Sequence, residues 1–366
     1  MNSGSAAATV TTDEVVARLD DDPTLFLLDV REPDEVSEWA IPGVHNVPLA
    51  KLAERLEEIP RDRDVVVICG AGSRARRGAE ILAEHGRTSR VMEGGMGAWA
   101  STYDTVSEEI AGALVTQVRR RGKGCLSYVV AAGDGAAVID PSLDVSIYEE
   151  VAQRSGARIT HVLDTHLHAD HISGARELAR RSGAALWLNS ADPFDFEFEA
   201  IRDGARIELD DGVHLSVAAI SVPGHTEGST MYQLGDAAIF TGDTLFLESV
   251  GRPDLAEEAE AYAHHLHRSL HQRVLPLGDA TRVFPAHYGA GVAVRSGQFV
   301  SAPLGTLRDS LPALALDEEA FVTWAIANVR DRPPNYRHVV AINSGREELD
   351  GESRHYELGP NRCAIG

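Results

Sequence analysis

Histidines and aspartates are concentrated in a short segment near the middle of the chain. Between His166 and His171, three of the six residues are histidines and one is an aspartate. The segment directly follows an apolar run that ends near Asp164, which predicts that it lies at the end of a β-strand. Three further residues of these types also follow predicted strands: His225, Asp243 and His287. Imidazole and carboxylate groups from separate strand ends suit a rigid metal site with open coordination positions, so we expect a metal centre here.

A second group of histidines is better explained by structure than by chemistry. His264, His265, His267 and His271 lie within a pattern that predicts an amphipathic helix over residues 259–271. On such a helix, histidines usually form a solvated or packed face.

Cys69 is the second candidate for chemistry. It ends an apolar run that begins at Val65, and it is followed by a glycine-containing loop, residues 70–75, that leads into a predicted helix. The two glycines let successive N–H groups point inward, and the helix N-terminus adds positive potential. Both effects favour a thiolate, which can carry a sulfur atom as a persulfide. The alternative for an isolated cysteine is a buried residue before an ordinary turn.

Length and composition indicate two soluble domains. The chain has 366 residues, too many for one ordinary hydrophobic core, and 43% of them are apolar. No apolar run approaches the roughly 20 residues that span a membrane, and residues 1–10 lack the features of a secretory signal. Three widely separated cysteines argue against a disulfide framework and favour a reducing compartment. We therefore expect a cytoplasmic protein without a membrane partner.

The formal charge of the chain is −22. A surface of this sign is repelled by phosphate backbones and anionic lipids, which argues against nucleic acid as a partner.

The elements that position Cys69 form a small α/β domain. Strands are predicted over Leu25–Val30 and Val65–Cys69, and a helix over Ser73–His85 that ends at Gly86. Buried strands that alternate with helices predict a parallel sheet.

The pattern changes after this domain. We expect a linker over Thr105–Ala113, because the residues there are polar and small. Strands and helices follow it and predict a sheet-rich α/β sandwich. The expected strands are Leu126–Ala132, Ala136–Asp140, Ile159–Asp164, Leu215–Val222 and Val283–Pro285, and the expected helices are Val145–Ser155 and Ala259–His271.

Four motifs in the first domain, taken in order and spacing, resemble the rhodanese family over residues 10–105. They are Asp29-Val30-Arg31-Glu32 with Glu35, Ile41-Pro42-Gly43-Val44-His45-Asn46-Val47-Pro48, the loop from Cys69 to Ala75, and Glu93-Gly94-Gly95-Met96-Gly97-Ala98-Trp99. The resemblance implies that Cys69 is the sulfur-accepting nucleophile and that Arg74 assists it. It also implies a substrate cradle formed by Gly70, Ala71, Gly72, Ser73 and Ala75. A domain of this kind can alternatively serve as a docking module that recruits a sulfur donor.

The ligand-rich segment, with His225, Asp243 and His287, resembles the metallo-β-lactamase superfamily, and we assign it to a second domain over residues 113–366. The resemblance implies an αββα sandwich. This fold hosts dizinc hydrolases, nucleases, flavodiiron reductases and persulfide dioxygenases, so the fold alone does not define the reaction.

The segment Gly251-Arg252-Pro253-Asp254 is similar to the persulfide dioxygenase family. This resemblance implies one Fe(II) per chain, held by His166, His225 and Asp243, with three positions left for substrate and O₂. It implies that Arg252 binds the substrate. Four further residues would surround the metal without forming a second filled site: His168, Asp170, His171 and His287.

Together the two resemblances imply a sulfur-metabolism enzyme. The expected reaction oxidises a low-molecular-weight thiol persulfide, such as glutathione persulfide, with O₂ and water to sulfite and thiol, while Cys69 transfers sulfane sulfur to or from thiols, sulfite or thiosulfate. The alternative is a dizinc thioester hydrolase of the glyoxalase II type with a regulatory rhodanese-like domain. The sequence does not identify the preferred thiol or the direction of sulfur transfer. It also leaves open whether the two sites exchange sulfur directly and whether the protein is a homo-oligomer.

Overall fold

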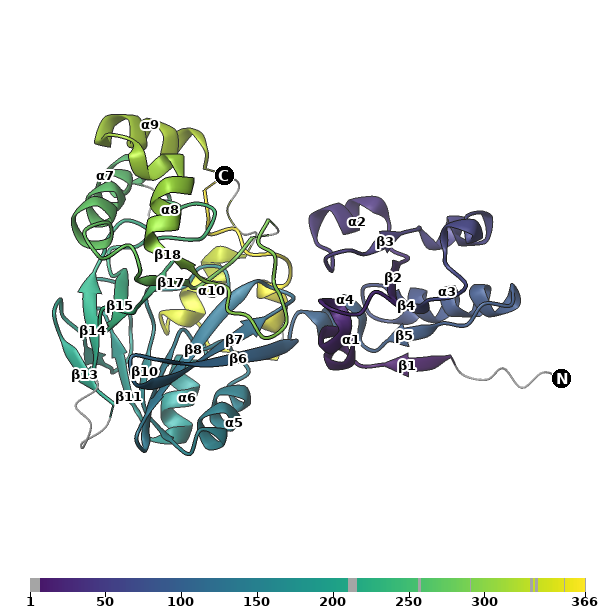
Figure 1. Ribbon diagram of the computed structural model, residues 1–366, viewed down its shortest axis with the longest axis horizontal. Coiled ribbons are helices and arrows are strands. Elements are labelled where there is room, and N and C mark those ends of the chain that lie inside the picture. Colours follow the sequence, from purple (N-terminus) through teal and green to yellow (C-terminus); the bar gives the residue numbers. More distant parts are fainter. Residues whose placement is uncertain are drawn as a thin grey trace.

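The computed structural model describes residues 7–209, 216–255, 258–289, 291–329, 332, 335–351 and 353–365. The chain forms two layered units that lie side by side, a smaller one from the N-terminal third and a larger one from the remainder (Figure 1). No helix in the described ranges has both the length and the apolar character needed to cross a membrane.

The smaller unit is built on a five-stranded sheet with the order β1-β5-β4-β2-β3. All of its strand pairs are parallel, as predicted. The apolar runs in β2 and β4 are buried because helices cover both faces of the sheet. The elements are β1 (Ala8–Val10), α1 (Thr12–Leu19), β2 (Leu25–Asp29), α2 (Pro33–Glu38), β3 (His45–Asn46), β4 (Asp64–Ile68), α3 (Ser73–Glu84), β5 (Arg90–Met92) and α4 (Gly95–Trp99).

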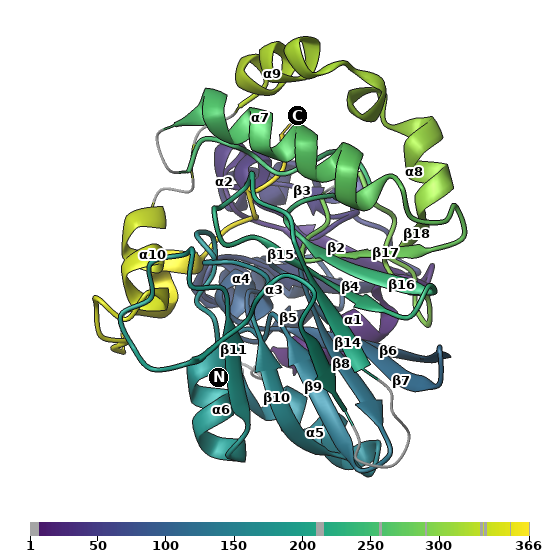
Figure 2. The ribbon, with the colours of Figure 1, turned by 90° about the vertical axis from the view of Figure 1, so that its left-hand side faces the viewer.

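The larger unit is a sandwich of two mixed sheets. A seven-stranded sheet has the order β12-β11-β10-β9-β8-β7-β6, and a six-stranded sheet has the order β13-β14-β15-β16-β17-β18. Aromatic side chains of Tyr128, Phe240 and Phe284 pack together in the core between the sheets. Helices α5 and α6 cover the outer face of the first sheet and α7, α8 and α9 that of the second, which confirms the αββα sandwich (Figure 2).

The five strands and two helices predicted for this unit correspond to β8, β9, β10, β14, β17, α5 and α7, and their described ends differ from the predicted ones by at most two residues; the other elements were not predicted. The first sheet contains β6 (Tyr103–Ile110), β7 (Ala113–Arg120), β8 (Cys125–Ala132), β9 (Gly135–Ile139), β10 (Arg158–Leu163), β11 (Ala185–Leu188) and β12 (Glu199–Ala200). The second contains β13 (Arg206–Glu208), β14 (Ser216–Ser221), β15 (Thr230–Leu234), β16 (Ala238–Gly242), β17 (Arg282–Pro285) and β18 (Ala302–Pro303). The helices are α5 (Ser146–Arg154), α6 (Ala175–Ser182), α7 (Ala259–Ser269), α8 (Leu304–Ser310), α9 (Glu318–Ala327) and α10 (Tyr336–Asn343). Leu215, the expected start of one strand, lies outside the described residues.

The expectation of a linker over Thr105–Ala113 is wrong. Most of this segment belongs to β6, which pairs along its whole length with β7 at the edge of the first sheet. Its central residues, Ser107 to Glu109, are polar because they are exposed at that edge. Only residues 100–102 separate α4 from β6.

The two units are joined by a polar interface at the end of β7. Arg120 donates from Nε to the carbonyl of Ala100 (2.6 Å), and Arg121 binds the Asp20 carboxylate through two bonds of 2.9 and 2.7 Å. The Trp39 indole donates to the carbonyl of Gly122 (2.7 Å). A Cβ atom at Gly122 would overlap the carbonyl of Trp99, so the close approach of the two units requires glycine there.

Candidate metal centre and cysteine site

Three ligand-type side chains converge at one end of the sandwich. His166 follows β10, His225 follows β14, and Asp243 follows β16. The Nε2 atoms of the two histidines lie 3.6 and 3.4 Å from Asp243 Oδ2. All three residues are buried, and within the described part of the chain none of these three atoms has a hydrogen-bond partner. Buried polar atoms without partners are costly, so their convergence fits a bound metal ion.

The Nδ1 atoms of the two histidines contact neighbouring groups, which leaves the Nε2 atoms available for a metal. His225 donates from Nδ1 to the Arg252 carbonyl (2.9 Å). His166 Nδ1 lies 2.9 Å from the hydroxyl of Thr165, which itself donates to Asp140. Burial lowers the pKa of both His166 and His225, so each remains neutral with a free lone pair on Nε2.

Asp243 supplies the negative charge of this set. Burial opposes its ionisation, but the protonated imidazole of His287, which also donates a hydrogen bond to it, holds the pKa of the Asp243 carboxyl below its usual range. Two neutral imidazoles and one carboxylate form a donor set that suits a divalent cation such as iron.

His287 lies beside this set, between two carboxylates. Its Nδ1 donates to Asp243 Oδ1 (2.7 Å), and its Nε2 is 3.0 Å from Asp170 Oδ2. Asp170 in turn accepts a bond from His171 Nδ1 (3.0 Å). Burial alone would lower the pKa of His287, but Asp170 and Asp243 raise it well above its usual value. This chain of contacts orients Asp243 and keeps a proton on His287.

His168 does not join the converging set. Its Nε2 donates to Asp140 Oδ1 (3.2 Å), and Asp140 also accepts from the backbone N–H of Thr165 (2.7 Å). The carboxamide of Asn343 in α10 fixes the same loop from outside, because it donates to the carbonyls of His168 (2.9 Å) and His171 (2.8 Å).

Asp192 ties two ligand loops together, although no motif marks it in the sequence. Its carboxylate accepts from the backbone N–H of Leu167 (2.8 Å), next to His166. It also accepts from Thr226 Oγ1 (2.9 Å) and Gly228 N (2.8 Å), in the loop of His225. A Cβ atom at Gly228 would overlap Asp192, so that loop position requires glycine.

Two cysteines also lie at the centre and were not anticipated. Cys125, at the start of β8, groups with Asp170, His171 and His287. Although burial favours its neutral thiol, His171 and His287 lower the pKa of Cys125 to about 6. Cys363 groups with Asp243 and His287 because the C-terminal segment returns to the site.

Arg252 is directed toward protein groups. Its guanidinium donates to the Asp254 carboxylate (2.7 and 2.9 Å) and to the Arg362 carbonyl (3.0 Å). Its backbone N–H donates to the Cys363 carbonyl (3.0 Å). Arg252 therefore connects the His225 loop to the C-terminal segment.

The cysteine site lies where β4 meets α3. The Cys69 sulfur accepts a bond from Gly72 N (3.0 Å). Gly72, the residue directly before α3, has a φ of 98°, a left-handed conformation that favours glycine. Arg74 forms a two-bond ion pair with Glu35 (2.6 and 2.7 Å). The loop is closed by α4, where Met96 N donates to the Cys69 carbonyl (2.9 Å).

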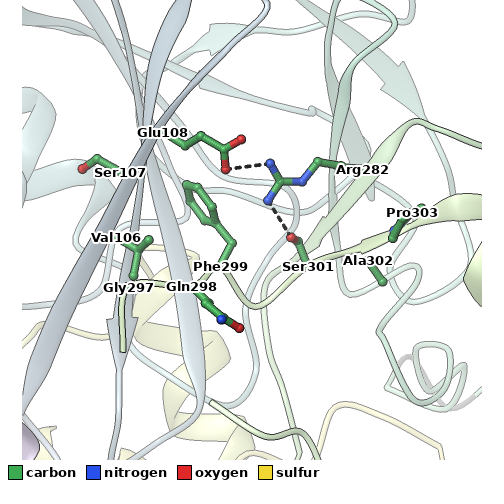
Figure 3. Close-up of a pocket in the computed structure, with 10 residues that line it drawn as sticks. All are labelled: Val106, Ser107, Glu108, Arg282, Gly297, Gln298, Phe299, Ser301, Ala302 and Pro303. Atoms are coloured by element: carbon green, nitrogen blue, oxygen red, sulfur yellow. Dashed lines mark hydrogen bonds and ion pairs between the residues drawn. The ribbon is translucent and has the colours of Figure 1, made fainter. Parts of the chain in front are cut away.

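An open groove of about 470 Å³ lies away from both sites (Figure 3). It is formed by β6, β17 and residues 297–303, and none of the candidate site residues lines it. Arg282 spans the groove, bound to Glu108 (2.8 Å) and Ser301 (3.0 Å).

The histidines of α7 form no ligand group among the described residues. His267 instead stacks on His271.

Comparison with known proteins gives matches for both units. A model of the metallo-beta-lactamase superfamily matches residues 120–287, and a model of the rhodanese-like domain matches residues 11–102. The hydroxyacylglutathione hydrolase of Acidiphilium cryptum is 40% identical over 128 residues, which are 34% of this chain and only 51% of that protein. The hydroxyacylglutathione hydrolase of Pseudomonas entomophila is 30% identical over 224 residues, 59% of this chain and 83% of that protein.

Among solved structures, ETHE1 from Myxococcus xanthus is similar, with a TM-score of 0.55 and 24% sequence identity. The match covers 67% of this chain and 100% of that one. At this identity the similarity is evidence of a shared fold.

Proposed function

Because the chain belongs to the metallo-β-lactamase superfamily and carries a rhodanese-like domain, we propose that it oxidises a low-molecular-weight thiol persulfide at one iron and transfers sulfane sulfur through Cys69. In the balanced oxidation, one persulfide, one O₂ and one water yield one thiol, one sulfite and two protons. The observation that carries the proposal is the convergence of three partnerless ligand atoms from His166, His225 and Asp243.

His166, His225 and Asp243 would hold an Fe(II) ion, which would supply redox chemistry between O₂ and sulfur. The protein supplies orientation. Arg252 and Thr165 fix the two imidazoles through their Nδ1 atoms. His287 holds a proton at Nδ1 beside Asp243, which keeps that carboxylate oriented and offsets its charge.

The motif Gly251-Arg252-Pro253-Asp254 supports the dioxygenase over other reactions of this fold, because it resembles the persulfide dioxygenase family. The position of His287 supports one metal. Its Nδ1 donates to Asp243 Oδ1 (2.7 Å), as expected of a residue that orients this ligand.

A second candidate function, a dinuclear thioester hydrolase, has its own support. Four buried ligand-type residues form a second group: Cys125, Asp170, His171 and His287. The relatives named above are called hydroxyacylglutathione hydrolases.

Metal analysis and oxygen uptake separate the two functions. We expect one iron per chain and O₂ consumption that depends on glutathione persulfide. Two zinc ions per chain with cleavage of a glutathione thioester, and no persulfide-dependent O₂ uptake, would establish the hydrolase instead. Cys69→Ser should abolish sulfur transfer between thiols while O₂ uptake continues, since the two sites lie in separate domains.

A further inference from the structure

The loop that surrounds Cys69 has little uncompensated positive charge. Between residues 69 and 75 the only charged side chain is Arg74. Both of its terminal nitrogens are bound by the two oxygens of Glu35, at 2.6 and 2.7 Å. The hydrogen bonds from Arg74 lower the pKa of Glu35 to about 2, so the pair stays ionised and its net charge is zero. The next cation along the chain, Arg76, is exposed on α3.

A second ion pair lies beside the cradle and is also neutral overall. Asp29 ends β2 next to the end of β4, and its carboxylate binds Arg31 at 2.9 and 2.7 Å. Both side chains are buried. Each of these two ion pairs beside the cysteine therefore has zero net charge.

The positive potential of the backbone N–H groups at the start of α3 is directed at the cysteine itself. The backbone N–H at Gly72, where α3 begins, points to the Cys69 sulfur. Cys69 is only 1% exposed, so a donor must lose water to bring its sulfur into contact. Burying a dianion against a cradle of zero net charge is far less favourable than burying a neutral or singly charged group.

We infer that Cys69 takes sulfane sulfur from an organic persulfide in preference to thiosulfate, and that Glu35 determines this preference by neutralising Arg74. The inference rests on the proposed sulfur-transfer function of Cys69. Thiosulfate is a dianion whose charge adjoins the transferred sulfur. A thiol persulfide carries at most one negative charge at its two sulfur atoms. Any other charged groups of the molecule are distant from the transferred sulfur.

The transfer needs no oxidant. The Cys69 thiolate attacks the outer sulfur of RS–SH, so that a bond forms between Sγ and that sulfur while the RS–S bond breaks. The RS sulfur leaves with the bonding electron pair and takes the proton of the outer sulfur, which gives RSH and a Cys69 persulfide anion. From thiosulfate, the leaving group would be sulfite.

The test measures loading of Cys69 in the full-length, iron-loaded protein under anaerobic conditions, where O₂ cannot consume the persulfide. Glutathione persulfide and thiosulfate serve as donors, and mass spectrometry follows the gain of one sulfur atom on the Cys69 peptide. We expect glutathione persulfide to load Cys69 at least tenfold faster. In Glu35→Gln, Arg74 is freed to bind anions, and the rate ratio of thiosulfate to persulfide should rise roughly tenfold.

Two further variants control for fold and charge. Asp34→Asn removes the same charge from an exposed position of α2 and should leave the ratio unchanged. Ala71→Lys adds a cation to the exposed part of the loop without disturbing Glu35, and it should raise the ratio. If thiosulfate loads the unmodified protein as fast as the persulfide or faster, the inferred preference is overturned. It is also overturned if the rate ratio is unchanged in both Glu35→Gln and Ala71→Lys. Neither result affects the proposed sulfur transfer itself. Absence of loading by both donors overturns the proposed sulfur transfer as well.

Discussion

The Nδ1 atom of His225 lies 2.9 Å from the backbone carbonyl oxygen of Arg252. A carbonyl can only accept, so Nδ1 carries the proton and Nε2 presents its lone pair toward Asp243. The guanidinium of Arg252 is bound by Asp254 and by the Arg362 carbonyl, which fixes the backbone at that position. Arg252 does not contact the metal-binding atoms, but by fixing its own backbone it orients the candidate ligand His225.

Arg252→Ala should therefore weaken iron binding by roughly tenfold to a hundredfold, the usual effect of losing a group that orients a ligand. Arg252→Lys should restore only part of the affinity, because an ammonium cannot make the two-bond contact with Asp254. Iron affinity is measured by competition with a chelator, with the exposed Arg268→Ala as control. If iron binding and thermal stability are unchanged while kcat/KM for the persulfide falls, Arg252 contacts the substrate, as the family resemblance implies.

His225→Ala and His287→Ala should differ in metal content. Removal of His225 leaves two ligands, which hold Fe(II) poorly, so iron and O₂ uptake should be lost together. His287→Ala removes a group bound to Asp243 and should retain most of the iron with reduced activity. Metal content after dialysis gives the answer. Equal loss of metal in both variants would contradict the mononuclear site and favour the dinuclear hydrolase.

Asp192→Asn should loosen both ligand loops. Its carboxylate accepts three bonds, from Leu167, Thr226 and Gly228, and an amide group would turn a donor toward at least one N–H. Each hydrogen bond to a charged group contributes about 1.5 to 3 kcal/mol, so iron affinity should fall at least tenfold. The exposed Asp195→Asn is the matched control. A loss of thermal stability with unchanged iron affinity would restrict Asp192 to a role in folding.

Much of the fold follows from local pattern. The apolar runs at Leu25 and Val65 predicted parallel strands because strands buried on both faces lack polar alternation. The linker prediction failed because the polar residues of β6 conceal a strand. The polar residues of β6 reflect an edge strand with an exposed face, and a pattern of this kind over Ser107–Glu109 also occurs in connecting segments.

The candidate site was only partly predictable. His166, His225 and Asp243 follow strands, and strand ends on one side of a sandwich meet in space. Asp192 and Cys363 carry no such signal, since they reach the site from segments without ligand-like neighbours. The sequence identified Arg252 as a residue of interest, but the direction of its guanidinium depends on Asp254 and the C-terminal segment.

The ion pair between Glu35 and Arg74 should stabilise the protein across neutral pH. The folded-state pKa of Glu35, about 2, lies below the ordinary value of 4.5 because Arg74 donates to it. A lowered pKa contributes stability that is fully present above about pH 4.5 and is lost as the pH falls through about 2. Both side chains are 37% exposed, and solvent screening limits the contribution to about 1 kcal/mol or less.

The comparison of unmodified protein with Glu35→Gln in urea, followed by circular dichroism, measures this contribution. The glutamine side chain in this variant retains an acceptor for the backbone N–H of Glu32, so the start of α2 is preserved. We expect a constant difference in the unfolding midpoint from pH 8 to about pH 5, and a shrinking difference at lower pH. Asp34→Asn, which removes an exposed carboxylate outside this ion pair, should show no loss of this kind. A difference that grows as the pH falls would contradict an ionised Glu35, and would remove the charge neutralisation on which its proposed role at Cys69 depends.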